Sequence, residues 1–102
     1  MIEEFEVENP EEFELMVKRG DIRINRALVK TILKNLKSKK RHHHALSVIC
    51  ISEGEIYDVT IDKKDFQYTL ESTLPKFEEE EMYEDCEEIV KALKYLGKKK
   101  KL

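Results

Sequence analysis

Two apolar stretches that end in runs of basic residues constrain the fold of this chain more than any other feature. Residues 27–41 carry leucine, valine and isoleucine at helical spacing and end in Lys39, Lys40 and Arg41, and residues 88–101 repeat this design with four lysines at the end. Apolar residues at steps of three and four predict a helix with one buried face. The sequence therefore predicts two long helices that pack against the rest of the protein.

Length and composition favour one folded domain over residues 1–102. Apolar residues make up 40% of the chain and Gly and Pro are few, so a hydrophobic core is expected. Charged residues make up another 40%, mostly Lys and Glu, a balance typical of heat-adapted proteins. No apolar run approaches the roughly 20 residues of a membrane helix, and the acidic start lacks the pattern of a signal peptide, so we expect an intracellular protein.

The first twenty residues predict a short strand and a short helix. Phe5 and Val7 alternate with glutamates, as in a half-buried strand. Asn9 supplies an N-cap for a helix from Pro10 to Arg19, whose first residue is the proline, and Gly20 can end it. The first long helix then follows.

The rest of the chain predicts three more strands and the second long helix. Residues 45–52 form a nearly unbroken β-branched run, which we expect at the centre of the sheet with both faces covered. Residues 57–61 and 66–70 alternate apolar and polar side chains after turns, so we expect them to complete an antiparallel meander. The last helix is expected to open at Thr73 to Pro75 and to end at Gly97.

Together these elements predict a small α+β domain in which two long helices pack on an antiparallel sheet of three to four strands. With an offset of 61 residues, Phe5 lines up with Phe66 and Val29 with Val90. This pairing suggests two similar strand-plus-helix motifs, in residues 1–44 and in residues 45–102. The sequence leaves open whether they arose by internal duplication, and it does not give the strand order.

Charge is distributed along the chain in blocks of alternating sign. Ten bases against one acid lie between residues 18 and 41, and acidic blocks precede and follow them. Steps of three and four place most of this basic block on one helix face. Such a face could bind a partner or the phosphates of a nucleic acid, or it could be a solvated surface balanced by the protein's own acids. The candidate residues are Arg23, Arg26, Lys30, Lys34, Lys37, Lys39, Lys40 and Arg41.

No residue is predicted to be catalytic or to bind a cofactor. The chain has no Gly-rich phosphate loop, and no Ser or Cys has a clear His partner. Asp58 and the run Asp62 to Lys64 faintly resemble the acidic motif of metal-dependent nucleases, but they are better explained as strand and turn residues. We therefore expect the protein not to be an enzyme.

The histidines and cysteines predict no metal centre. Consecutive side chains cannot easily point at one ion, so His42, His43 and His44 are expected in a charged loop, and whether they bind a metal is left open. Cys50 and Cys86 are too far apart for a zinc site built on paired cysteines. Packing is their expected role, and the sequence leaves open whether they form a disulfide.

A family resemblance follows from the repeated segments. Phe5-Glu6-Val7 and Leu28-Val29-Lys30 are echoed by Phe66-Gln67-Tyr68 and Ile89-Val90-Lys91. With the balance of Lys and Glu, this layout resembles the small proteins of filamentous viruses that infect hyperthermophilic archaea, of the Acidianus filamentous virus type. The resemblance implies a viral protein that acts in the host cytoplasm, with no catalytic residues to carry over.

Two functions are predicted for these features. The first is a non-enzymatic interaction module that binds a protein or peptide in a groove between the two halves or along the charged helix faces, or that pairs with a second copy of the chain. The alternative is nucleic-acid binding through the basic face from Arg23 to Arg41, helped by Lys98 to Lys101. No membrane partner is expected, and the sequence gives neither the identity of the partner nor the oligomeric state.

Overall fold

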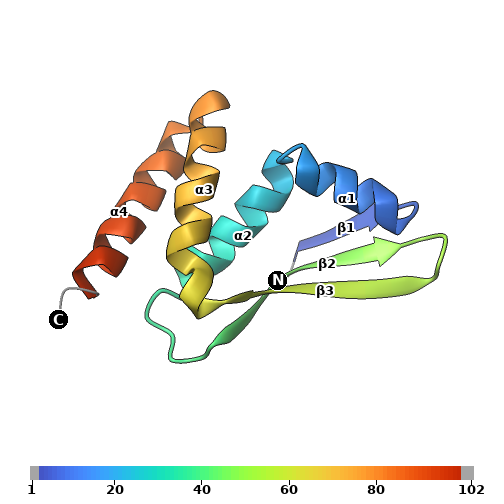
Figure 1. Ribbon diagram of the computed structural model, residues 1–102, viewed down its shortest axis with the longest axis horizontal. Helices are drawn as coiled ribbons and strands as arrows, with labels where there is room; N and C mark the ends of the chain where they lie inside the picture. The colour runs from blue at the N-terminus through green and yellow to red at the C-terminus, as the bar shows by residue number, and fades with distance from the viewer. Residues whose placement is uncertain (1–2, 100–102) are drawn as a thin grey trace.

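Three strands and four α-helices form a small α+β domain (Figure 1), in a computed structural model that describes residues 3–99 and the side chains of residues 3–97. In order, the elements are β1 (Glu3–Val7), α1 (Pro10–Lys18), α2 (Ile22–Lys34), β2 (His42–Cys50), β3 (Glu55–Asp62), the short 3-10 helix η1 (Lys63–Asp65), α3 (Phe66–Glu79) and α4 (Tyr83–Lys99). None of the helices within residues 3–99 is both long and apolar enough to cross a bilayer. Lys98 to Lys101, which were predicted to help nucleic-acid binding, have side chains outside the described part of the structure.

The N-terminal elements follow the sequence pattern. Asn9 caps α1, its side chain accepting from the Glu12 peptide N–H at 2.9 Å, and the predicted helix from Pro10 to Arg19 is confirmed to within one residue. After α1, Gly20 takes the left-handed conformation, with φ of +66°. Its N–H donates to a carbonyl of the last turn, as in a Schellman motif. Asp21 then caps α2.

β2 is the central strand, as its apolar run predicts. β1 pairs with it in parallel, from Glu3 opposite Leu46 to Val7 opposite Cys50, and β3 pairs with it in the antiparallel direction. The sheet is therefore mixed, and the prediction of an all-antiparallel sheet is wrong. Parallel pairing needs a long crossover, which residues 8–41 supply with two helices.

The helices lie on one face of the sheet only (Figure 1), so the expectation that both faces of β2 are covered is wrong. A bulge at Ala45 shifts the alternation of β2, and buried His43 and Leu46 therefore both face the helices. On the open face, Ile49 and Ile56 lie opposite each other on neighbouring strands, and Ile56 is 64% exposed. One side of the sheet thus remains uncovered by any helix in the described chain.

Helix α2 joins two hydrophobic clusters. The sheet cluster lies between the sheet, α1 and α2 and consists of Val7, Met16, Ile24, Ala27, Leu46, Val48 and Cys50. The helical cluster lies between α2, α3, α4 and the end of β3 and consists of Val29, Ile32, Ile61, Phe66, Leu70, Phe77, Ile89 and Ala92. Because α2 is packed on two sides, only four of its residues are exposed, and all four are basic: Arg23, Arg26, Lys30 and Lys34.

Residues 66–79 form α3, and the prediction of a strand over residues 66–70 is wrong. Phe66, Leu70 and Phe77 are at most 1% exposed in the helical cluster, whereas Tyr68 is 72% exposed. Phe66 and Leu70 are four residues apart, which satisfies a helix as well as the period-two alternation of a strand. The contacts of α3 with α2 and α4 decide between the two patterns.

Two further boundary predictions are wrong. Pro75, expected to open the last helix, lies inside α3. Proline has no N–H to donate to the Glu71 carbonyl four residues earlier. Pro75 is exposed, so this carbonyl lies on the solvent side of the helix. Gly97, expected to end the last helix, lies within α4. Phe66 begins a helix whereas Phe5 lies in a strand, so the second half does not repeat the strand-plus-helix order of the first, and a shared origin of the halves stays untested.

The four consecutive glutamates end α3 and form the turn to α4. The Glu81 N–H donates to the Glu78 carbonyl at 3.1 Å and the Met82 N–H to the Phe77 carbonyl at 3.0 Å, which is the Schellman arrangement. Glu81 has φ of +56°, a left-handed conformation that glycine usually supplies. Because this position holds a glutamate instead of a glycine, the sequence does not indicate the turn.

Alanine substitutions on α3 distinguish the helix from the predicted strand. Leu70→Ala should lower the free energy of unfolding by about 2–5 kcal/mol, because the fully buried side chain leaves a cavity. Tyr68→Ala should cost less than about 1 kcal/mol, because its side chain is exposed. Urea titration measures both values. Similar losses for the two variants would contradict the helix, since a strand would place both residues on one face.

Substitution with glycine tests the turn between α3 and α4. Glu81→Gly should raise the free energy of unfolding by about 0.5–1 kcal/mol, because glycine adopts the left-handed conformation without the steric cost of a Cβ atom. The control is Glu80→Gly. Glu80 is the C-cap of α3 with φ of −84°, a conformation that ordinary residues adopt without strain, so glycine relieves no strain there and should not stabilise the protein. Thermal unfolding followed by circular dichroism measures the change in stability of both variants. A loss of stability in Glu81→Gly would refute this turn.

Candidate functional site

The structure divides the eight predicted basic residues into two groups. Helix α2 ends at Lys34 and the chain turns immediately afterwards, so a single helical stripe from residue 23 to residue 41 is wrong. One group, which we call the α2 cations, remains on the exposed side of the helix: Arg23, Arg26, Lys30 and Lys34. The other group lies in the loop that leads to β2: Lys37, Lys39, Lys40 and Arg41.

The α2 cations border two adjoining hollows between α2 and the β1 side of the sheet. One hollow has a volume of about 170 Å³ and the other of about 150 Å³. Glu3 and Lys30 line both, so we treat the pair as one α2–β1 channel. Its charged and aromatic lining residues are Glu3, Phe5, Arg23, Arg26, Lys30, Lys34 and His44.

Within residues 3–97, Arg23 alone among the α2 cations makes an ion pair. Its Nη2 and Nε donate to the two carboxylate oxygens of Asp21 at 2.8 and 3.0 Å, and its guanidinium lies 6.0 Å from the centroid of the Phe5 ring. This hydrogen-bonded pair raises the pKa of Arg23 and lowers the pKa of Asp21. Arg26, Lys30 and Lys34 therefore supply the uncompensated positive charge of the channel.

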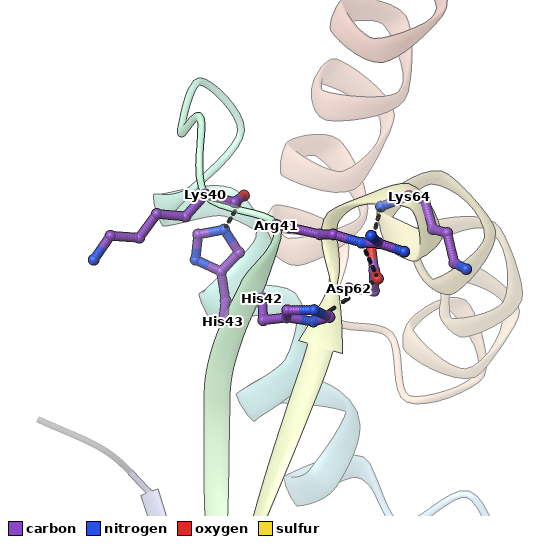
Figure 2. A network of polar contacts seen from close by, with 6 residues as sticks. All are labelled: Lys40, Arg41, His42, His43, Asp62 and Lys64. Atoms are coloured by element: carbon purple, nitrogen blue, oxygen red, sulfur yellow. Dashed lines mark hydrogen bonds and ion pairs between the residues drawn. The ribbon is translucent and has the colours of Figure 1, made fainter.

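Arg41, in contrast, is used to join the ends of β2 and β3 (Figure 2). Its Nε donates to Asp62 Oδ2 at 3.0 Å, and the Lys64 peptide N–H donates to Asp62 Oδ1 at 3.0 Å. His42 Nδ1 lies 3.8 Å from the same carboxylate. The backbone hydrogen bond from Lys64, followed by the contact with Arg41, lowers the pKa of Asp62. Arg41 is thus not part of a free basic face.

The three histidines lie in β2, and their predicted placement in a loop is wrong. His42 is exposed and His44 is half-buried, whereas His43 is buried against Phe66 with ring centroids 5.6 Å apart. The Nε2 of His43 lies 3.1 Å from the Lys40 carbonyl oxygen (Figure 2), which ties the loop to the strand. In the described part of the chain, no three His, Cys, Asp or Glu side chains are grouped so that they could hold a metal ion.

A serine, a histidine and an aspartate meet on the open face of the sheet, although the sequence suggested no such partner. Ser47 Oγ donates to Asp58 Oδ1 at 2.9 Å, and His44 Nε2 lies 3.0 Å from Ser47 Oγ. The same Nε2 is 3.0 Å from the Leu46 carbonyl oxygen, which can only accept, so this nitrogen carries a hydrogen. His44 therefore cannot take the Ser47 proton through it, and the cluster ties β2 to β3 instead of forming a nucleophilic triad.

Both cysteines are free, and they lie in different clusters. Cys50 is buried in the sheet cluster, and Cys86 packs against the helical cluster. Burial raises the pKa of both thiols, and nearby Glu53 raises the pKa of Cys50 further. The thiols are therefore uncharged at neutral pH, and the predicted packing role is confirmed.

A larger and more apolar groove, of about 330 Å³, lies between α1 and the strands β2 and β3. We call it the α1–β3 groove; its lining residues are Pro10, Phe13, Glu14, Val48, Cys50, Tyr57 and Val59. They come from both halves of the chain. Tyr57 is 47% exposed, and its hydroxyl donates to Glu53 Oε1 at 2.6 Å, which raises the pKa of Tyr57 to about 12. The tyrosine thus stays neutral and forms one wall of the groove.

Strand β3 borders this groove with an outer edge. It is the last strand in the order β1-β2-β3, so only one of its edges is paired in the described sheet. Most of its side chains are exposed. Glu14 lines the groove, and Glu53 and Glu55 lie at the hairpin end of the strand. The groove is therefore apolar inside and acidic at its rim.

Comparison of the chain with family models, with curated proteins and with solved structures finds no match. The candidate functional sites are therefore two surfaces of the protein: the basic α2–β1 channel at one edge of the sheet, and the apolar α1–β3 groove at the other.

The lowered pKa of Asp62 predicts a pH-dependent contribution to stability. Asp62→Asn keeps an acceptor for the Lys64 N–H but loses the charge, so the wild type should be more stable near pH 7. A carboxylate with a lowered folded-state pKa stabilises at pH values above the ordinary Asp value of about 3.9, and the stability is lost as pH falls through the folded-state value. Urea titrations from pH 7 to pH 2 should show the difference disappearing at the acidic end.

The control for this measurement is Asp65→Asn. Asp65 is exposed and makes no capping bond with its side chain, so its substitution should change stability little at any pH. A wild-type advantage over Asp62→Asn that persists unchanged to pH 2 would contradict the role of the Asp62 charge.

Proposed function

We propose that the protein is a non-enzymatic interaction module that binds an extended segment of a partner protein along the edge of β3. The observation that carries the proposal is the α1–β3 groove, a hollow of about 330 Å³ directly beside an unpaired strand edge. An edge offers main-chain hydrogen bonds to any extended peptide, and a neighbouring groove adds selectivity for its side chains.

The alternation of β3 defines where the side chains of an added strand would lie. Tyr57 and Val59 face the covered side of the sheet and line the groove, whereas Ile56 and Asp58 face the open side. A strand paired with β3 would alternate in the same way. Every second side chain of the partner would then enter the groove beneath α1.

Charge and polarity define the chemistry of the partner. The groove interior is formed by Phe13, Val48 and Val59, which favour apolar side chains. Glu14 lines the groove, and the exposed Asp58 lies on the open side of β3, where the intervening side chains of an added strand would point; both carboxylates favour lysine or arginine. The segment that fits best therefore alternates apolar and basic residues.

A second copy of the same strand is a poorer occupant. If β3 paired with another β3 in an antiparallel register centred on Asp58, the Asp58 side chains of the two copies would lie opposite each other. Like charges directly opposite each other destabilise a strand pair. Acidic side chains on an edge strand also oppose unspecific edge-to-edge association. We therefore favour a partner of opposite charge over a homodimer formed through this edge.

A designed peptide tests the proposal. An eight-residue peptide of alternating lysine and valine should bind the ¹⁵N-labelled protein, and the amide shifts should change along β3 and α1. N-methylation of alternate residues removes every second N–H from the peptide. It should abolish binding when the methylated edge faces β3 and should be tolerated when the other edge is methylated, because only one edge of an added strand donates to the sheet.

A matched pair of protein variants localises the binding. Tyr57→Lys removes one wall of the groove and adds a positive charge, so it should weaken peptide binding about tenfold or more. Tyr68→Lys makes the same change on α3, outside the groove, and should bind as the wild type. Equal affinity for a peptide with its lysines grouped together would overturn the proposal, and so would a concentration-dependent dimer that protects the β3 amides from exchange.

A further inference from the structure

We infer that the α2–β1 channel is a binding site for the phosphate backbone of a single-stranded nucleic acid. This site is independent of the interaction along β3. It lies beside β1, and β1 and β3 are the two opposite edges of the sheet. The inference rests on a row of fixed cations, on an aromatic ring in the channel and on a single opposing carboxylate.

The cations form a row because the helix has no other exposed positions. Arg23, Arg26, Lys30 and Lys34 follow one another at steps of three and four and extend over about 16 Å at a rise of about 1.5 Å per residue. Three of them have no ion pair within the described residues. A charged strand laid along α2 would therefore meet about three unneutralised cations in succession and release the counterions that these phosphates had condensed.

The channel also presents an aromatic surface. Phe5 lines it from β1 and is half-buried, and the Arg23 guanidinium lies over its ring. Ring faces and planar guanidinium groups are the surfaces on which unpaired bases stack, in sites that bind single strands with little sequence preference. Bases in a duplex are already stacked and cannot use such a surface. The combination of a cation row and an aromatic ring in the channel therefore favours a single strand.

The charge of Glu3 should oppose binding, whereas the charges of the α2 cations should favour it. Glu3 lines both hollows of the channel and is the only acidic residue that does so among the described residues. A phosphate in the channel would be repelled by its carboxylate. Removal of this charge should therefore strengthen binding, whereas removal of Lys30 and Lys34 should weaken it.

The experiment measures fluorescence anisotropy of labelled single-stranded 15-mers, oligo(dT) and oligo(U), across salt concentrations. For the wild type, log K should fall with log[salt] with a slope of about −2, as expected for about three phosphate contacts on a single strand. The double variant Lys30→Gln/Lys34→Gln should lower the magnitude of the slope to about 0.7 and weaken binding at least tenfold in dilute salt. Glu3→Gln should bind several-fold more tightly than the wild type.

The matched control is Lys18→Gln/Lys94→Gln, which removes the same charge from exposed positions on α1 and α4 and should behave as the wild type. Thermal unfolding checks that each variant is folded. Absence of binding at 25 mM salt would overturn the inference, and so would equal losses in the two double variants. A duplex or a polyglutamate peptide that binds as tightly as the single strands would overturn it as well. Lys30→Gln/Lys34→Gln should still bind the lysine–valine peptide, so failure at one edge is distinguishable from failure at the other.

Discussion

The structure depends on the burial of α2 between two groups of elements. Ile24 and Ala27 pack into the sheet cluster, and Val29 and Ile32 pack into the helical cluster, so this one helix holds the sheet to α3 and α4. A helix that is apolar on two sides retains only a narrow strip for solvent. In this protein the strip is entirely basic, and its charge is held at one edge of the sheet. The position of the positive charge on α2 is therefore a consequence of how the helix packs.

The two surfaces at the opposite edges of the sheet differ in chemistry because different helices flank them. At the β1 edge, α2 supplies Lys30 and Lys34, and the hollow is polar and positively charged. At the β3 edge, α1 supplies Phe13 and Glu14, and the hollow is apolar with an acidic rim. The basic β1 edge would attract anions and repel cations, and the acidic β3 edge would do the opposite. This separation makes the two proposed interactions compatible on one small domain.

Much of the fold could be predicted from the sequence, and the errors have physical causes. Local chemistry was sufficient for α1, with its cap at Asn9 and its stop at Gly20, for β3 and for the apolar part of β2, but it did not place His42 to His44 in that strand. It was insufficient for residues 66–70, since Phe66 and Leu70 satisfy two periods at once, and for the turn at Glu81, where a glutamate adopts a glycine conformation. The basic residues were found, but the end of α2 at Lys34 was not, so the predicted face was too long. Neither hollow could be predicted, because the channel depends on the parallel pairing of β1 beside α2, and the groove depends on how α1 packs on β2 and β3.

The parallel pairing of β1 also bears on the order in which the chain assembles. β2 and β3 are joined by a short hairpin, and α3 and α4 by a tight turn, whereas β1 reaches β2 only after residues 8–41 have been looped back. Loop closure costs more entropy as the loop lengthens, so we expect the local pairs to form before β1 docks. Phe5 and Glu3 enter with β1 and complete the α2–β1 channel. The β3 edge is thus available before folding is finished, while the basic channel exists only in the fully assembled domain.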